Sequence, residues 1–338
     1  MGLLQETCDA IHSRSKEIEQ HIIKNWNDAS DSKQYGRLVN MVAQYGAATN
    51  QKNVTIPKPC MIIASADHGV ADMGVSAYPK ETTVGMTQNY LIPKGAGANS
   101  LANYCGAHME VIDMGIDADM SWVPGLRSHK LGMGTKNFVE EPAMTREQAI
   151  EGIETGIKLV QEKMADGYNV FLVGEMGISN TTASALMTAK FAGLTAEEAT
   201  GRGTNISDER LKLKQRIVHD VLVKYKDIPK DDAIGILAAV GGFEFTCIVG
   251  VILGAAAHHG MVIIDGFNTS ACALVAKTLV PASMDYVMAS HLSAEKAAKS
   301  SLQNLGLEAY VDLGLCLGEA SGGSVQMGML DLAVHMYK

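Results

Sequence analysis

Short runs of apolar residues recur along the chain and predict the strands of a buried sheet. Runs of this kind, with few polar side chains in alternation, are typical of parallel strands that are covered on both faces. The predicted strands are Cys60–Ala64, Met109–Ile112, Val170–Val173, Met261–Ile264 and Tyr286–Met288. Most of the segments between them carry apolar residues at helical spacing. Strands that alternate with helices indicate an α/β fold.

The first 55 residues lack such runs and are predicted to be helical. Apolar and charged residues mix there at helical spacing between residues 9 and 47. A polar break at residues 28–36 separates two groups of apolar positions. We therefore expect two helices, one on each side of that break.

One α/β unit can be followed from helix to strand to helix. Thr145 and Gln148 have the spacing of a capping box, and the helix that they begin should end at Asp166–Gly167. The strand through Val173 follows, and after it comes the glycine-rich segment 174–182. Sheets of this class bind ligands beyond the carboxyl ends of their strands. Segment 174–182 is therefore a candidate ligand-binding turn.

Polar residues at the end of this turn outline an anion site. Ser179, Asn180 and Thr181 stand where the next helix begins, so their side chains can cap it while free backbone N–H groups face a ligand. Lys214, in a later predicted helix, could reach a phosphate. The alternative is ordinary helix capping and a solvated lysine. Segment Gly201–Asn205 lacks the third glycine of a dinucleotide fingerprint, and the chain has no Walker A loop.

One carboxylate stands between glycines near the C-terminal end of the chain. Glu319 lies in the small-residue, apolar segment 314–323, where glycines allow the backbone to approach a ligand closely. Apolar neighbours raise the pKa of a carboxyl group because they disfavour its charged form. Glu319 is therefore the best candidate for a catalytic base, and an exposed turn glutamate is the alternative.

Other polar residues directly follow predicted strands. Asp67 and Asp265 should lie at the ligand-binding edge of the sheet, where Asp265 could hydrogen-bond to a sugar hydroxyl. Ser293 resembles the start of another capped helix just beyond a strand and is a second candidate anion contact. His68 has no partner at metal-ligand spacing, which favours a structural or orienting role. Turn aspartates without a function are the alternative for both acidic residues.

Composition and charge exclude several classes of protein. The 338 residues carry a formal net charge of -9 without a block of basic residues, which argues against a nucleic-acid surface or a polybasic membrane anchor. Six scattered cysteines form no C-x-x-C pair, so neither a zinc site nor a disulfide framework is indicated, and we expect neither a metal nor a cofactor. The longest apolar stretch, Cys247–His258, is too short to span a bilayer, and the N-terminal residues lack the apolar core of a signal peptide. These features predict a cytoplasmic protein.

Six motifs together resemble one enzyme family. They are ADHGV (66–70), GEMGISNTT (174–182), VGGFEF (240–245), IIDGF (263–267), SHLSAEKAA (290–298) and LGEASGG (317–323). In order, they are similar to motifs of the nicotinate-nucleotide:dimethylbenzimidazole phosphoribosyltransferases, and the resemblance runs from about Ile56 to Met327. Enzymes of that family move a phosphoribosyl group from nicotinate mononucleotide to the base that becomes the lower ligand of a cobamide.

The resemblance implies a fold, a reaction and a set of site residues. The fold is a Rossmann-like parallel sheet flanked by helices (56–300), with a small helical domain formed by residues 1–55 and 301–338. The protein is implied to be a homodimer or a heterodimer with a paralogue, and its substrates are nicotinate mononucleotide and a small aromatic acceptor. Glu319 is then the general base and Glu175 the second catalytic glutamate. Phosphate and ribose contacts fall on Gly177, Asn180, Thr181, Gly203, Lys214, Asp265 and Ser293.

The expected pocket for the acceptor departs from the family's pattern. Gly85 stands where the family has a glutamine, and Ala77 stands where family members can carry a serine. Loss of an amide and a hydroxyl favours an acceptor with fewer polar atoms. We therefore expect either a benzimidazole-like base or a phenol, such as phenol or p-cresol. The residues expected around the acceptor are Ala77, Tyr78, Gly85, Met86, Met176 and Leu317.

Two other classes of protein are alternatives. A non-catalytic paralogous subunit that supports an active partner would share these motifs. The presence of the candidate base Glu319 argues against this class. A nucleotide-binding dehydrogenase is disfavoured because the chain lacks G-x-G-x-x-G.

Overall fold

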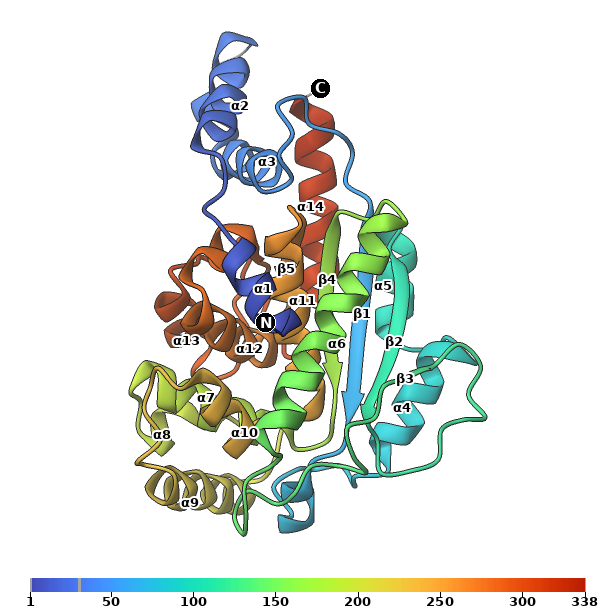
Figure 1. The fold of residues 1–338 in the computed structure, drawn as a ribbon, viewed down its shortest axis with the longest axis vertical. Coiled ribbons are helices and arrows are strands. Elements are labelled where there is room, and N and C mark those ends of the chain that lie inside the picture. Colours follow the sequence, from blue (N-terminus) through green and yellow to red (C-terminus); the bar gives the residue numbers. More distant parts are fainter. Residues whose placement is uncertain (1, 30–31, 338) are drawn as a thin grey trace.

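Six parallel strands form one sheet at the centre of the molecule (Figure 1). The computed structural model describes residues 2–29 and 32–337. The strands are β1 (Pro59–Ala66), β2 (His108–Gly115), β3 (Arg127–Ser128), β4 (Val170–Met176), β5 (Met261–Ile264) and β6 (Val287–Ala289). Their order, β3-β2-β1-β4-β5-β6, is that of a doubly wound α/β fold. The predicted fold class is confirmed.

All five predicted strands are present, and β3 is an addition. Its two residues, Arg127 and Ser128, pair only with Ile112 and Asp113 of β2, and such a short polar strand leaves no apolar run in the sequence. Strand β6 begins one residue later than expected because Tyr286 ends a 3-10 helix.

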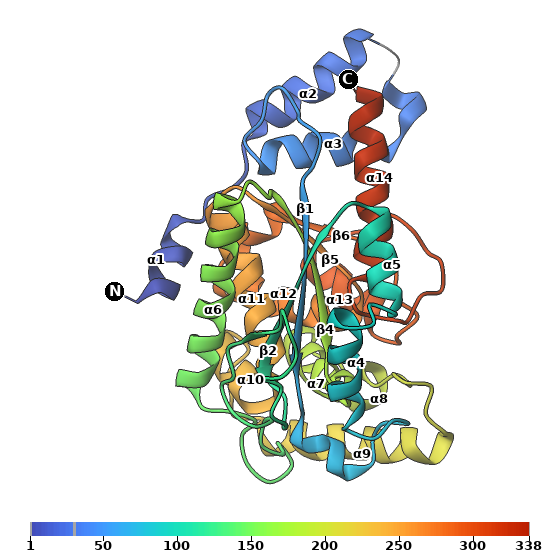
Figure 2. The same cartoon turned by 90° about the vertical axis from the view of Figure 1, so that its right-hand side faces the viewer.

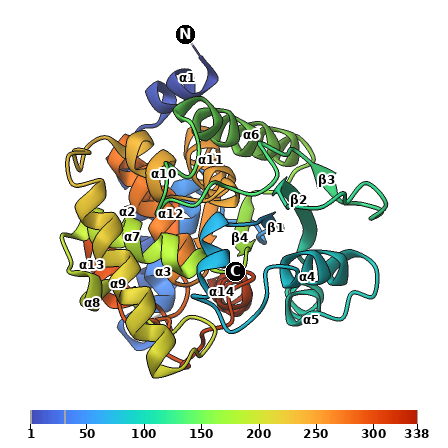
Figure 3. The same cartoon turned by 90° about the horizontal axis from the view of Figure 1, so that it is seen from below.

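Helices cover both faces of the sheet, with α6 and α11 on one face and α4, α5 and α14 on the other (Figures 2 and 3). The helices are α1 (Leu3–Ala10), α2 (Lys16–Ala29), α3 (Arg37–Ala48), α4 (Thr82–Leu91), α5 (Gly97–Tyr104), α6 (Arg146–Ala165), α7 (Asn180–Ala192), α8 (Ala196–Ala199), α9 (Asp208–Lys224), α10 (Ala233–Val240), α11 (Phe243–Ala257), α12 (Phe267–Leu279), α13 (Ala298–Leu305) and α14 (Ser321–Tyr337). None of the helices described is long and apolar enough to cross a bilayer.

The capping box predicted for α6 is confirmed. The Thr145 hydroxyl accepts from the Gln148 N–H at 3.1 Å, and the Gln148 side-chain oxygen accepts from the Thr145 N–H at 2.9 Å. The helix ends at Ala165, and Asp166 is its C-cap. The capping pattern therefore places this helix correctly at both ends.

The two helices expected in the N-terminal region are α2 and α3, and α1 precedes them. The break between them holds a 3-10 helix at Ser32–Tyr35, and residues 30 and 31 of that break lie outside the described residues. The pattern missed α1 because Thr7 is the only residue of that helix that is buried. Helix α1 packs against α6, whereas α2, α3 and the end of α14 lie together at the end of the molecule away from α9 (Figure 1). The division into domains of 56–300 and of 1–55 with 301–338 stays a prediction.

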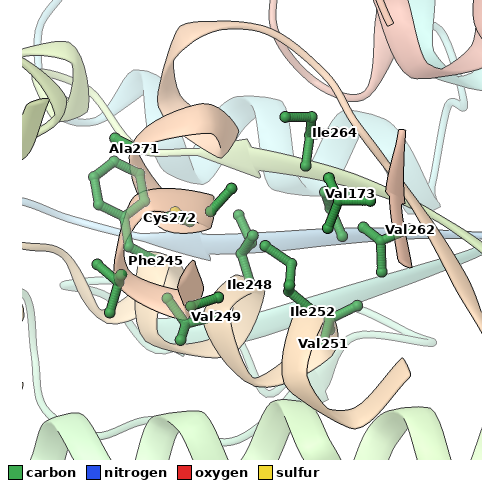
Figure 4. Packing of buried hydrophobic residues seen from close by; sticks show 14 of the residues in the cluster. Val173, Phe245, Ile248, Val249, Val251, Ile252, Val262, Ile264, Ala271 and Cys272 are labelled. Carbon is green, nitrogen blue, oxygen red and sulfur yellow. The ribbon is translucent and has the colours of Figure 1, made fainter. Parts of the chain in front are cut away.

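Helix α11 fills much of the core between the sheet and α6. Its side chains meet those of β4, β5 and α12 (Figure 4). The backbones of α6 and α11 approach closely where glycines face the opposite helix. A Cβ at Gly156 would overlap the Cys247 carbonyl oxygen, and one at Gly250 would overlap that of Ile153. This pair of helices therefore depends on small residues at the contact.

Gly250→Ala should destabilise the protein because the added methyl group must push α11 away from α6. We expect the free energy of unfolding to fall by about 2 kcal/mol, a typical cost of overpacking a core. Urea denaturation followed by circular dichroism measures it. Gly85→Ala is the matched control, since a Cβ at Gly85 meets nothing within 4 Å on helix α4. An equal loss of stability in both variants would contradict the close-packing account.

Candidate active site

A cavity of about 570 Å³ opens at the carboxyl ends of β4, β5 and β6. Its wall is formed by the segments that follow these strands, by helix α4 and by the turn before α14. The parallel topology brings these distant segments to one edge of the sheet, where ligands of doubly wound folds bind.

Most of the site residues expected from the sequence lie on this wall. They are Tyr78, Met86, Glu175, Met176, Gly177, Asn180, Thr181, Gly203, Asp265, Ser293, Leu317 and Glu319. Ala77, Gly85 and Lys214 do not line the cavity. The Ala77 N–H donates to the Thr204 hydroxyl at 2.9 Å, Gly85 is exposed on α4 next to Met86, and Lys214 lies behind Thr181.

Glu319 stands on a turn with an uncommon backbone conformation. Gly318, Glu319 and Ala320 have φ values of 83°, 59° and 60°, and two of the three are not glycine. Positive φ at such residues costs free energy and tends to occur at functional sites. The turn lies directly on β4, because a Cβ at Gly174 would come within 2.5 Å of the Ala320 nitrogen. The glycine at position 174 is therefore what allows the turn to lie there.

A buried carboxylate at the end of β5 holds this turn in place. Oδ1 of Asp265 accepts hydrogen bonds from the N–H groups of Gly322 at 2.6 Å and Gly323 at 3.2 Å, in the first turn of α14. Burial raises the pKa of Asp265 to about 6, and these N–H donors oppose the rise. Oδ2 is buried and has no partner among the described residues, and Asp265 is one of the residues that line the cavity. Asp265 thus anchors the helix that directly follows the turn of Glu319.

The surroundings of Glu319 make its carboxylate a stronger base than an exposed glutamate. Burial raises its pKa, the nearby Tyr90 hydroxyl of α4 partly offsets that shift, and the charge of Asp265 adds to it. A carboxylate with a raised pKa accepts a proton more readily at neutral pH.

Glu175 faces the same cavity from the end of β4 and is only 7% exposed. The Asn180 side-chain NH₂ donates to its Oε2, and the Asn268 side chain donates to the Asn180 oxygen at 3.1 Å. Burial raises the pKa of Glu175 to about 8, against the effect of the two amides, and Glu244 nearby contributes to the rise.

A buried lysine lies at the other end of the cavity. Lys214 is 1% exposed, and its Nζ donates to the Thr181 hydroxyl at 2.7 Å. Burial lowers the pKa of Lys214 to about 8, and Glu295 opposes that shift. The Gly203 N–H beside it donates to a Glu295 oxygen at 2.8 Å. A buried cation that has a neutral hydroxyl as partner is suited to a bound anion.

Two expectations about helix starts are wrong. Ser179 does not cap α7 through its side chain, because its φ of 78° is left-handed and its hydroxyl makes no capping hydrogen bond. Ser293 does not begin a helix. Its hydroxyl accepts from the Glu295 N–H at 3.3 Å in a local turn, and α13 begins only at Ala298.

Sequence reasoning missed several residues on or beside the cavity wall. Thr82 and Tyr90 lie one turn before and after Met86 on α4, and this i, i+4, i+8 spacing is the signal that could have found them. Asn268 and Glu295 lie next to or within motifs that were recognised for other residues. Among the described residues, no three His, Cys, Asp or Glu side chains are grouped to hold a metal ion.

The fold and the cavity are those of a doubly wound α/β protein with a ligand site at the carboxyl edge of its sheet. A family model described as phosphoribosyltransferase matches residues 11–338. The nicotinate-nucleotide–dimethylbenzimidazole phosphoribosyltransferase of Geobacter metallireducens is 42% identical over 303 residues, which cover 90% of this chain and 85% of that protein. The protein of the same name from Chloroflexus aggregans is 41% identical over 298 residues, 88% of this chain and 84% of that one.

A solved structure agrees with these relatives. The crystal structure of CobT from Thermus thermophilus matches with a TM-score of 0.90 and 32% sequence identity, over 95% of this chain and 96% of that chain. The chain therefore belongs to the nicotinate-nucleotide–dimethylbenzimidazole phosphoribosyltransferase family, and it is a pentosyltransferase.

Gly174→Ala should lower activity because the new methyl group displaces the turn that carries Glu319. We expect kcat for phosphoribosyl transfer to fall about 100-fold, as for a shift of a catalytic group by about 1 Å. Gly323→Ala is the matched control, because a Cβ there has its nearest neighbour at 3.6 Å. Steady-state kinetics with both variants test this, and equal activities would contradict the close approach of the turn to β4.

Proposed function

We propose that this protein transfers the phosphoribosyl group of nicotinate mononucleotide to a small aromatic acceptor, giving an α-ribotide and nicotinate. The observation that carries the proposal is Glu319, a partly buried carboxylate with a raised pKa at one end of a cavity whose other end adjoins the buried cation Lys214. The names of the relatives, which specify this transfer with dimethylbenzimidazole, support it.

The phosphate and ribose would bind at the end of the cavity near Lys214. Thr181 and Asn180 lie in the first turn of α7, where the helix dipole favours an anion. Gly177, Gly203 and Ser293 lie around them on the wall, and the free oxygen of Asp265 is available to a ribose hydroxyl.

The reaction needs a base and no acid. Nicotinate departs from C1′ as a neutral pyridine, so its leaving nitrogen requires no proton, and the transition state has oxocarbenium character. As the acceptor attacks C1′, Glu319 takes the proton from the attacking nitrogen or oxygen. A single direct displacement inverts C1′ and converts a β nucleotide into an α one.

The wall near Glu319 is suited to an acceptor with few polar atoms. Tyr78, Met86, Met176 and Leu317 are the predicted acceptor-pocket residues on the wall, and Gly85 and Ala77 supply neither an amide nor a hydroxyl. A phenol such as p-cresol fits this description, since its O–H, with a pKa of about 10, can be deprotonated by a carboxylate during attack. The acceptor is therefore a phenol or a benzimidazole-like base.

The proposal includes a cytoplasmic dimer of identical or paralogous chains. Tyr78 and Leu317 are each 57% exposed, and Leu313 is 58% exposed in the loop before Leu317. A second chain over these apolar side chains would cover the mouth of the cavity.

A product assay tests the proposed function most simply. The isolated protein is incubated with nicotinate mononucleotide and either dimethylbenzimidazole, a purine, phenol or p-cresol, and nicotinate and ribotide are measured by chromatography. We expect turnover that depends on the acceptor, and a loss of about 100-fold or more in kcat for Glu319→Gln, since general bases contribute that much. Activity of Glu319→Gln equal to that of the wild type would contradict Glu319 as the base.

The same assay separates the alternatives. Turnover only when a paralogous chain is added, with no effect of Glu319→Gln, would support a non-catalytic subunit. Ready turnover of dimethylbenzimidazole without any product from phenols would contradict the phenolic acceptor alone. A separate binding measurement with NAD tests the dehydrogenase alternative, and absence of NAD binding would exclude it.

Gly85→Gln should change the acceptor preference. A Cβ at Gly85 meets nothing within 4 Å, so a longer side chain has room to reach over the rim toward the acceptor. A new amide would hydrogen-bond to the second nitrogen of a benzimidazole, and it would lack that partner opposite a phenol. We expect kcat/KM for dimethylbenzimidazole relative to phenol to rise about tenfold, a common value for one hydrogen bond. Gly85→Ala is the control, and an unchanged ratio in Gly85→Gln would place position 85 outside the acceptor site.

A further inference from the structure

Four carboxyl groups line the cavity that, in the proposed function, receives an anionic nucleotide. They belong to Glu175, Asp265, Glu295 and Glu319. Of the described residues that line the wall, none is Lys or Arg. Nicotinate mononucleotide carries a phosphate and a carboxylate of its own, so four ionised carboxylates would repel it at close range. An uncharged state of one of the four removes part of that repulsion.

Two of the four accept hydrogen bonds from backbone N–H groups, and a third has a proposed role that requires its charge. Asp265 accepts two backbone N–H hydrogen bonds, and Glu295 accepts one from Gly203. Such donors stabilise the charged form of a carboxylate. Glu319 must be ionised to act as a base. Glu175 is the remaining group: it accepts a hydrogen bond from the Asn180 side chain, but the effect of burial on its pKa outweighs that donor.

Glu175 lies in surroundings that favour a neutral acid. It is 7% exposed, and its hydrogen-bond partner is the uncharged amide of Asn180, which in turn accepts a hydrogen bond from Asn268. No ion pair joins it to a basic side chain in the part of the chain that the structure describes. An unpaired buried carboxylate is costly, whereas the neutral acid is not. The raised pKa of Glu175, about 8, has this origin.

The charged groups around Glu175 also favour its neutral form. Glu244 at the start of α11 and Asp265 at the end of β5 both oppose a further negative charge there. His68 is the imidazole below this site, and its Nε2 lies 2.6 Å from Glu244 Oε1 in a fully buried pair under Gly177. The other titratable groups that face Glu175 are Glu319 on its turn, Tyr90 on α4 and Cys272 on α12.

We propose that Glu175 works as a neutral carboxylic acid that donates a hydrogen bond to an acceptor oxygen of the bound nucleotide. Asn180 fixes the other oxygen of the carboxyl group, so that the O–H is directed away from it. The two glutamates then have opposite tasks, because Glu319 takes a proton from the acceptor while Glu175 keeps its own. This assignment rests on the proposed function for the identity of the ligand.

Infrared difference spectroscopy tests the protonation state without any substrate. Raising the pH of the substrate-free protein should remove the carbonyl stretch of a protonated carboxylic acid, with a midpoint near pH 8. Glu175→Gln should lack this change, and Glu244→Gln should shift its midpoint to lower pH. Glu110→Gln is the matched control, because Glu110 is paired with Lys163 at 2.6 Å and is ionised throughout. An identical band in the wild type and in Glu175→Gln would overturn the proposal.

Calorimetric binding of nicotinate mononucleotide between pH 6.5 and 9.5 tests the role of the proton. If only the neutral acid donates, affinity of the wild type falls as the pH rises through the pKa of Glu175, by up to about tenfold per pH unit. Glu175→Gln, whose amide cannot lose its donor, should not show this fall. Lys214 titrates in the same range, so a fall of equal size in both proteins would assign it to Lys214 and contradict the donor role.

The two experiments separate this inference from the proposed function. If no nicotinate mononucleotide binds at any pH, the proposed function fails, and the infrared result still decides whether Glu175 is neutral. If the nucleotide binds with the same pH dependence in the wild type and in Glu175→Gln, the donor role fails and the proposed function stands.

Discussion

The active site depends on how one buried carboxylate holds the N-terminus of one helix. Asp265, at the end of β5, binds the first free N–H groups of α14, and the turn that precedes this helix carries Glu319. The turn accepts three successive residues with positive φ because the helix behind it is fixed and because Gly174 leaves room on β4. A turn with unfavourable φ values persists only when the surrounding structure holds its backbone in that conformation. The proposed catalytic base, Glu319, is thus positioned by the sheet, although it lies far from β4 and β5 in sequence.

The cavity shows how burial can give similar side chains different tasks. Glu319 and Glu175 are both glutamates with raised pKa values. The first adjoins the Tyr90 hydroxyl on an open wall, and the second adjoins the Asn180 amide above the buried, hydrogen-bonded side chains of His68 and Glu244. Lys214 at the other end is shifted in the opposite direction by the same cause. Desolvation disfavours the charged form of a group. Burial therefore raises the pKa of a carboxylic acid and lowers the pKa of a lysine.

The sequence was sufficient for the fold class and for much of the candidate site, because apolar runs and glycine motifs are local signals. The strand Met261–Ile264 was placed to the residue, and Glu319 and Glu175 both face the cavity. What failed depends on three-dimensional contact. The left-handed conformation of Ser179 cannot be recognised from a polar residue before a helix. The anchoring of α14 by Asp265 joins residues more than fifty positions apart, and no local pattern marks it.

Acceptors that are already ionised and need no base show directly whether Glu319 removes the acceptor's proton. The transfer rates of the wild type and of Glu319→Gln are compared at neutral pH for p-cresol, which is un-ionised, and for a nitrophenol with two nitro groups, 2,4-dinitrophenol, which is ionised. We expect Glu319→Gln to be slower than the wild type by about 100-fold or more with p-cresol and by no more than about threefold with the nitrophenol, because a general base has no proton to remove from an ionised acceptor. An equal deficit with both acceptors would contradict the role of Glu319 as the base.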